Sequence, residues 1–155
     1  MNSNVGRVFV LCSLAACSAG STMDRDASTD ASACSSLALG TSAPVRQADG
    51  GLPSPTGGAI AAGDYELREV LWAIPTAPRT MRGSMRVQGA SIEMVLEEER
   101  SLFSASGTFV TFANNLEFSQ RCPSPSMTGA RGFTANSDRI DWYWSPNELH
   151  RWVRR

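Results

Sequence analysis

Lysine is absent from this chain of 155 residues, and all 14 basic side chains are arginine. They are balanced by 15 acidic residues, so the sequence has neither the basic surface of a nucleic-acid-binding protein nor an acidic tail. His150 is the one histidine, and no two cysteines have the CxxC spacing of a structural zinc site. We therefore expect no metal, no other cofactor and no nucleic-acid partner.

The sequence also lacks the short motifs that carry common enzymatic chemistry. It has no glycine-rich phosphate loop after a strand, no GxSxG and no HExxH. The densest charge run, residues 97–100, reads EEER, and neighbouring strand residues point to opposite faces, so it is typical of a solvated strand end. His150 has no nucleophile or acid placed beside it by the strand pattern. We expect a protein that is not an enzyme.

An apolar run covers residues 8–16. Neither this run nor any other apolar stretch reaches the roughly 20 residues of a membrane helix. Arg7 precedes the run, and the run ends in the letters LAAC at Cys17. A positive start, a short apolar centre and small residues before the cut are typical of a secretory signal. The cysteine at the cut resembles a bacterial lipobox, in which it is acylated and becomes the new N-terminus. The alternative is an ordinary signal cut elsewhere, with Cys17 a plain thiol.

The lipobox divides the chain into three parts. Residues 1–16 are the predicted signal peptide, and residues 17–62 are the acylated Cys17 followed by a flexible linker rich in Ser, Ala, Gly and Pro. Residues 63–155 are the predicted folded domain. We expect a protein of the cell envelope whose membrane contact is the lipid anchor. Ser18 follows the cysteine where a retention signal would have Asp, which favours the outer membrane.

Two cysteines remain for the mature domain, because Cys12 leaves with the signal and Cys17 carries lipid. Cys34 and Cys122 then meet an oxidising compartment, where two thiols allow a single connectivity. We predict a Cys34–Cys122 disulfide. The alternative is two free thiols in one chain.

From residue 63 onward, short apolar runs are separated by turn residues, which is the spacing of an antiparallel β-meander. A two-residue turn at positions 89–90 gives a consistent hairpin. The turn places apolar pairs on one face and opposite charges on the other, which cross-strand pairing favours. The predicted pairs are Gly83–Leu96, Met85–Met94 and Val87–Ile92 on the apolar face, and Arg82–Glu97 and Arg86–Glu93 on the outer face.

Three further turns complete the predicted sheet. A loop over residues 113–115 pairs Phe112 with Leu116 and Val110 with Phe118; a turn at 136–137 pairs Phe133 with Ile140; and a turn at 146–147 pairs Trp144 with Leu149, Trp142 with Arg151 and Tyr143 with His150. With a first strand over residues 64–74, about eight strands result. The fold class is all-β, an antiparallel up-and-down meander that closes into a small lipocalin-like barrel.

Four short motifs in this order carry a resemblance: GGAI at 57–60, GDYEL at 63–67, CP at 122–123 and GFTA at 132–135. Together they resemble a group of uncharacterised myxobacterial-type lipoproteins, which are similar to small lipocalin-like barrels. The resemblance implies the fold and the envelope location and carries no activity. Asp64 and Glu66 depart from it, because that first-strand pattern usually has uncharged residues there.

The barrel interior is the candidate ligand-binding site. The predicted registers point apolar side chains inward, and the candidate lining is Met85, Met94, Phe112, Phe118, Trp142 and Trp144. Trp142 is expected to lie beside Arg131 and Arg151 and to stack on a guanidinium at an open end of the barrel. The alternative is that these side chains fill the barrel. Trp152, flanked by Arg151 and Arg154, offers a second candidate surface if it points outward.

Two functions follow from these observations. The first is a lipid-anchored, non-enzymatic binding or interaction module that contacts another envelope protein. The alternative is a lipocalin-like carrier of a small hydrophobic ligand. A cavity of a few hundred Å³ inside the barrel favours the carrier, and a filled interior favours the interaction module.

The lipid anchor gives the first testable prediction. Replacing the acylated thiol by Cys17→Ser should abolish incorporation of a labelled fatty acid and release or misprocess the protein, whereas Cys12→Ser, inside the removed signal, should leave labelling intact. Acyl labelling that survives Cys17→Ser would contradict the prediction.

Overall fold

The computed structural model describes residues 34–123 and 128–155, so the predicted signal peptide and Cys17 lie outside the described residues. The described residues form nine strands: β1 (Ser42–Gln47), β2 (Gly63–Trp72), β3 (Arg79–Gln88), β4 (Ser91–Glu98), β5 (Ser101–Phe112), β6 (Asn115–Cys122), β7 (Thr128–Ala135), β8 (Arg139–Ser145) and β9 (Glu148–Arg154). Within this part of the chain there is no helix of the length and apolarity needed to cross a membrane.

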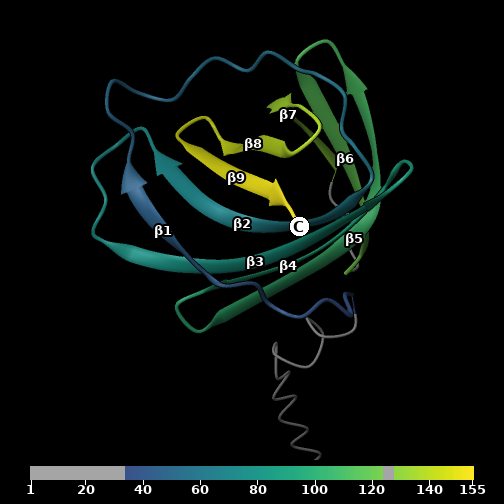
Figure 1. The fold of residues 1–155 in the computed structure, drawn as a ribbon, viewed down its shortest axis with the longest axis horizontal. Helices are drawn as coiled ribbons and strands as arrows, with labels where there is room; N and C mark the ends of the chain where they lie inside the picture. Colours follow the sequence, from purple (N-terminus) through teal and green to yellow (C-terminus); the bar gives the residue numbers. More distant parts are fainter. Residues whose placement is uncertain (1–33, 124–127) are drawn as a thin grey trace, which may run out of the picture.

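Strands β2 to β9 pair with their sequence neighbours in antiparallel fashion and form a ring (Figure 1). The ring closes where β9 pairs with β2, from Tyr65 opposite Arg154 to Trp72 opposite Glu148. The predicted all-β meander is therefore confirmed, and the first and last strands of the predicted barrel are neighbours. Closure leaves β2 and β9 without free edges, which protects the sheet from edge-to-edge association.

Strand β1 corrects the prediction of a flexible linker that extends to residue 62. It pairs in parallel with the end of β2, as in Val45 opposite Val70, and antiparallel with the start of β3, as in Ala43 opposite Met81. Strands β2 and β3 pair directly only over Gly63–Glu66, so β1 fills the gap where they diverge. Ala43 and Val45 are buried, at 0% and 3% exposure. Burial of these two alternating apolar side chains orders a segment whose composition alone predicts no ordered structure.

The predicted β3–β4 hairpin is confirmed in every pair, including Met85 opposite Met94 and Arg86 opposite Glu93. Gly89 takes a positive φ of 57° in its turn, a conformation that glycine adopts at little cost. Met85, Val87, Ile92, Met94 and Leu96 are all buried, and Arg82 is exposed. The hairpin thus presents its apolar face to the core as its sequence requires.

The β5–β6 register differs from the prediction by one residue. The turn has two residues instead of three, so Phe112 lies opposite Asn115 and Phe109 opposite Phe118. A shift of one residue reverses the faces of one strand, and Val110 and Phe112 are exposed at 60% and 49%. The predicted inward position of Phe112 is therefore wrong. Ala113 takes a positive φ, of 52°, in this turn.

The β7–β8 turn also lies one residue away from the prediction, so that Phe133 faces Trp142 and Ala135 faces Ile140. The side-chain carbonyl of Asn136 accepts hydrogen bonds from the backbone N–H groups of residues 138 and 139, at 3.0 and 2.9 Å, and this Asx turn sets the register. Moving a turn centre by one residue changes each pairing by two. The predicted faces therefore survive, and Phe133 and Ile140 are both buried.

The β8–β9 turn is predicted correctly, but a β-bulge between Tyr143 and Ser145 shifts the pairing beyond it. Trp142 consequently faces His150, where the prediction placed Arg151, and Tyr143 faces Leu149 where it placed His150. The same shift points Trp152 into the core, at 0% exposure. The alternative contact patch around an outward Trp152 is therefore wrong.

The connection from β1 to β2 runs past β7 and β6 before β2 begins (Figure 1). Gly57 joins β7 there: its N–H donates to the Phe133 carbonyl at 2.8 Å and its carbonyl accepts from Ala135 N–H at 2.9 Å. A Cβ atom on Gly57, at φ 74°, would lie 2.3 Å from the Ala113 carbonyl oxygen, so only glycine fits. Contact with Gly57 also holds the β5–β6 turn, which explains why local turn preferences mispredicted it.

The predicted Cys34–Cys122 disulfide is confirmed, with the two Cα atoms 5.3 Å apart. Next to it, Glu93 on β4 accepts hydrogen bonds from Ser35 Oγ at 3.0 Å and from the Ser36 N–H at 2.6 Å. Together these contacts attach the beginning of the described chain to the outer face of β4.

The departure of Glu66 from the motif of uncharged residues has a structural reason. Its carboxylate accepts hydrogen bonds from both the N–H and the hydroxyl of Thr41, each at 2.5 Å, and lies within ion-pair distance of Arg68 and Arg155. The Thr41 hydrogen bonds outweigh desolvation and lower the pKa of Glu66 below its ordinary value of 4.5. Glu66, on β2, therefore binds the residue that immediately precedes β1.

The disulfide should stabilise the domain chiefly by limiting the unfolded chain, because it closes a long loop. We expect the double substitution Cys34→Ser, Cys122→Ser to lower the free energy of unfolding by about 2–4 kcal/mol in urea titrations. Wild-type protein unfolded in dithiothreitol should show the same loss. Equal stability of the oxidised wild type and the double variant would contradict this role.

Glu66 gives a pH-dependent prediction. Because its pKa is lowered in the folded state, its contribution to stability is complete above about pH 4.5 and is lost as the pH falls through the folded-state pKa. Thr41→Val removes one donor and raises that pKa. The variant should be less stable than wild type at pH 7, and the difference should shrink in acid. Thr111→Val, an exposed substitution on another hairpin, should show no such pH dependence; a Thr41→Val deficit that stays constant with pH would contradict the mechanism.

Candidate functional site

The two halves of the barrel interior differ in packing. The end where β2 begins is filled. Its large apolar side chains are each at most 2% exposed; they are Tyr65, Met85, Ile92, Phe133 and Ile140. Ile60, from the connection before β2, packs against this cluster. Any ligand must therefore enter at the other end, where β2 and β4 end and β3 and β5 begin.

At that open end lies a pocket of about 280 Å³, which we call the aromatic cup. Strands β5 to β8 supply its lining, which consists of Phe103, Phe118, Gln120, Thr128, Gly129, Arg131, Trp142 and Trp144. Half of these residues are aromatic, and Arg131 is the only charged one among the described residues that line the cup. Concave, largely apolar pockets with few polar groups are the usual form of small-molecule sites.

The aromatic rings of the cup contact one another edge to face. Trp142 packs against Phe118 with centroids 5.9 Å apart and against Trp144 at 5.8 Å, and Phe103 meets Trp144 at 5.8 Å. These separations and interplanar angles of 70–81° are favourable for aromatic pairs. Each ring supports its neighbour, so the cup has a wall of fixed shape.

The cup lies where β7 and β8 separate. Their pairing stops at Phe133 opposite Trp142, so Trp144 lies outside that ladder. Arg131 bridges the gap, because its Nε donates to the Trp144 carbonyl at 3.2 Å and its Nη1 to the Ala130 carbonyl at 3.3 Å. The end of the β7–β8 pairing thus leaves a backbone carbonyl that holds the one charged side chain of the cup lining.

A second pocket, of about 400 Å³, adjoins the cup through Phe103 and Trp144; we call it the rim pocket. Its polar side chains contact one another within the protein. Arg79 forms an ion pair with Glu98 and lies 5.0 Å above the Trp72 ring, and His150 Nε2 lies 2.7 Å from Glu148 Oε1. These side chains therefore already have partners in the rim pocket.

His150 is 1% exposed and stacks on Trp144, with centroids 5.1 Å apart and an interplanar angle of 2°. Its contacts with Trp144 and Glu148 hold the imidazole as part of the wall between the two pockets. The Trp142 indole nitrogen is also buried, and it has no hydrogen-bond partner among the described residues. A buried donor without a partner costs about 1–3 kcal/mol, and such groups are often completed by water or a ligand.

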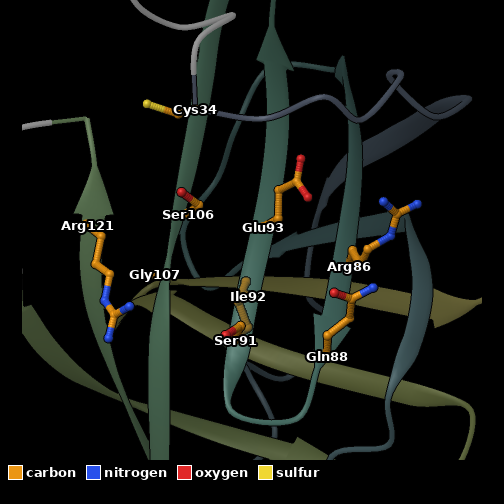
Figure 2. A pocket seen from close by; sticks show the side chains of 9 residues that line it. All are labelled: Cys34, Arg86, Gln88, Ser91, Ile92, Glu93, Ser106, Gly107 and Arg121. Carbon is orange, nitrogen blue, oxygen red and sulfur yellow. The ribbon is translucent and has the colours of Figure 1, made fainter.

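A third pocket, of about 340 Å³, lies on the outer surface and is shown in Figure 2. Glu93 and Ser106 lie on adjacent strands beneath Cys34, with Arg86 and Arg121 on opposite sides (Figure 2). Glu93 already accepts hydrogen bonds from Ser35 and Ser36, and Arg86 is bonded to Asp64 at 2.7 Å. We call this pocket the outer groove. Its lining includes Cys34, and its Glu93 binds the two residues that follow the disulfide cysteine.

The structure distributes the six predicted lining residues over three environments. Phe118, Trp142 and Trp144 meet in the cup. Met85 and Met94 are buried in the core and line none of the pockets described above. Phe112 is exposed on the β5–β6 hairpin.

The predicted environment of Trp142 is corrected in part. Its strand partners are Phe133 and His150, because of the turn shift and the bulge, and not Arg131 and Arg151. The cation–π pair at the open end joins Arg79 to Trp72 instead. Arg131 nevertheless lines the same pocket as Trp142.

Sequence reasoning did not select Phe103 or Gln120 as lining residues. A register test of the turn at positions 99–100 would have found Phe103, because that turn places it opposite Leu96 on the inner face. Gln120 is buried within β6 and its amide donates to the Pro123 carbonyl at 3.0 Å. A glutamine on an otherwise apolar inner face is the sequence feature that could have identified Gln120 as a lining residue.

Acidic residues do not gather into a metal site: the described residues contain no group of three or more His, Cys, Asp or Glu side chains arranged to hold a metal ion. Glu97 and Glu98, in the acidic run, instead pair with Arg82 and Arg79 of the neighbouring strand. Comparison of the chain with protein-family models, with curated proteins and with solved structures gave no match. The function therefore has to be inferred from the site itself.

Proposed function

We propose that this protein is a lipid-anchored, non-enzymatic binding protein of the cell envelope, and that its barrel carries a small, mostly apolar molecule in the aromatic cup. The observation that carries the proposal is the cup itself, a pocket of about 280 Å³ at the open end of a barrel whose other end is filled. A filled interior would have favoured an interaction module, whereas a cavity of this size favours a carrier.

The lining supports an apolar occupant with a polar end. The rings of Phe103, Phe118 and Trp144 are half-buried, so part of their apolar surface faces solvent when the cup holds only water. Transfer of that surface from water to a ligand is favourable by about 25 cal/mol per Å². The one charged side chain of the lining, Arg131, favours an occupant with a polar end.

The envelope location has independent support in the sequence and in the fold. The apolar run that ends at Cys17 matches a lipobox. The Cys34–Cys122 disulfide is of the kind that persists in exported proteins. An anchor of this type would keep the carrier at a membrane, where small apolar molecules concentrate.

A second candidate function rests on the β5–β6 hairpin. Val110 and Phe112 lie two residues apart on one face of its tip and are 60% and 49% exposed. Exposed apolar side chains of this kind are found in protein contact surfaces. In that case the hairpin, and not the cup, would recognise an envelope protein.

The two functions are separated by a matched pair of substitutions on neighbouring strands. With 2-naphthamide as the probe in isothermal titration calorimetry, Phe118→Ala, in the cup, should weaken binding by roughly tenfold, which corresponds to about 1.4 kcal/mol of lost apolar contact. Phe112→Ala, on the hairpin tip, should change the affinity less than twofold.

Native mass spectrometry of the protein purified from its own membrane should detect a co-purifying small molecule, and Phe118→Ala should reduce its occupancy. Absence of probe binding to the wild type, or equal loss in both variants, would contradict the carrier. Capture of a specific envelope protein that depends on Phe112 and not on Phe118 would favour the second candidate.

A further inference from the structure

We propose that the ligand of the aromatic cup is an anionic amphiphile, a compact apolar body with a carboxylate or similar oxyanion that pairs with Arg131. The inference rests on the proposed carrier function and specifies its ligand class. It starts from the charge of the cup: one guanidinium stands among four aromatic side chains and three uncharged residues, and no acidic residue lines the same pocket.

Among the arginines that line the cup, the rim pocket or the outer groove, Arg131 and Arg121 have no ion pair with a described carboxylate, and of these two only Arg131 lines the cup. Arg79 in the rim pocket is paired with Glu98, and Arg86 in the outer groove is paired with Asp64. Within the described part of the chain, no carboxylate lies within ion-pair distance of Arg131. An anionic ligand would supply the missing counter-charge, whereas a cationic ligand would be repelled.

The orientation of Arg131 is fixed by backbone acceptors. Nε donates to the Trp144 carbonyl and Nη1 to the Ala130 carbonyl, so the guanidinium is held beside the cup while its Nη2 hydrogens remain for an occupant. A charged N–H donor makes a short, strong hydrogen bond to a carboxylate, which gives direction as well as attraction. Prior positioning reduces the entropy that an exposed arginine otherwise loses when it pairs.

The other polar side chains that line the cup, Gln120 and Thr128, add no charge that competes with Arg131 for the ligand. Gln120 already donates its amide hydrogen to Pro123 within the protein and carries no charge. The apolar body would lie against Phe103, Phe118 and Trp144, with its charged end towards the exposed Arg131.

The test compares 2-naphthoate with its neutral isostere 2-naphthamide, both small enough for the cup. The protein is the mature chain from residue 17 with Cys17→Ser, so that no detergent competes for the pocket, and its disulfide is kept oxidised. At low salt the acid should bind the wild type about three- to tenfold more tightly than the amide, a modest ratio because Arg131 is exposed. The advantage should shrink in 0.5 M NaCl.

Arg131→Gln should remove the preference for the acid, so that the two probes bind with equal affinity, and an unchanged circular dichroism spectrum shows that the barrel is still folded. Arg131→Lys should restore part of the preference. Arg121→Gln, an exposed arginine of β6 that lines the outer groove and not the cup, is the matched control and should leave both affinities unchanged.

The two proposals fail in different ways. If neither probe binds the wild type, the carrier function is wrong. If both bind equally, or if the preference for the acid survives Arg131→Gln, the cup binds ligands but the anionic class is wrong.

Discussion

The pairing of β9 with β2 is the constraint on which the rest of the barrel depends, because it converts an open meander into a ring with an interior. Trp152 lies at the centre of this closure, opposite Leu67 and with 0% exposure. Gly83 makes room for it: a Cβ atom there would lie 3.1 Å from the Trp152 ring and 2.7 Å from a Leu96 methyl. A large ring on one side of the barrel is thus matched by a missing side chain on the other.

The outer surface near the closure is tied together by charges. Arg151 of β9 pairs with Glu69 of β2 and with Asp141 of β8, so one guanidinium joins three consecutive strands of the ring. The Asp141 hydrogen bond is the main reason that the pKa of Arg151 is raised. Glu69 and Asp141 are themselves buried, and a buried carboxylate is tolerated only when it is paired in this way. The charges on this face are therefore structural.

Alternation of apolar and polar residues predicted the strands well, because it reports which face is buried. The number of residues in each turn was harder to predict. A shift of a whole turn by one residue preserves the faces, and the β7–β8 prediction therefore retained its inward residues despite a wrong pairing. A change of one residue in turn length or one bulge reverses the faces, which misplaced Phe112 and Trp152. The first error arises from a contact distant in sequence, because Gly57 packs against the β5–β6 turn. The second arises from the bulge in the β8–β9 pairing, which the turn residues alone do not predict.

Part of the cup could be predicted from the sequence. Trp142, Trp144 and Phe118 could be predicted because large aromatic residues on an inner face are candidates under any register. Arg131 was expected beside Trp142 at an open end of the barrel, but as its strand partner, which it is not. Its place in the cup depends on the separation of β7 from β8, and no local pattern encodes that separation. The separation leaves the Trp144 carbonyl outside the β7–β8 ladder, Arg131 donates to it, and the charge is thereby held beside an apolar pocket. The end of one strand pairing thus fixes the one charged side chain of the cup lining among its aromatic rings.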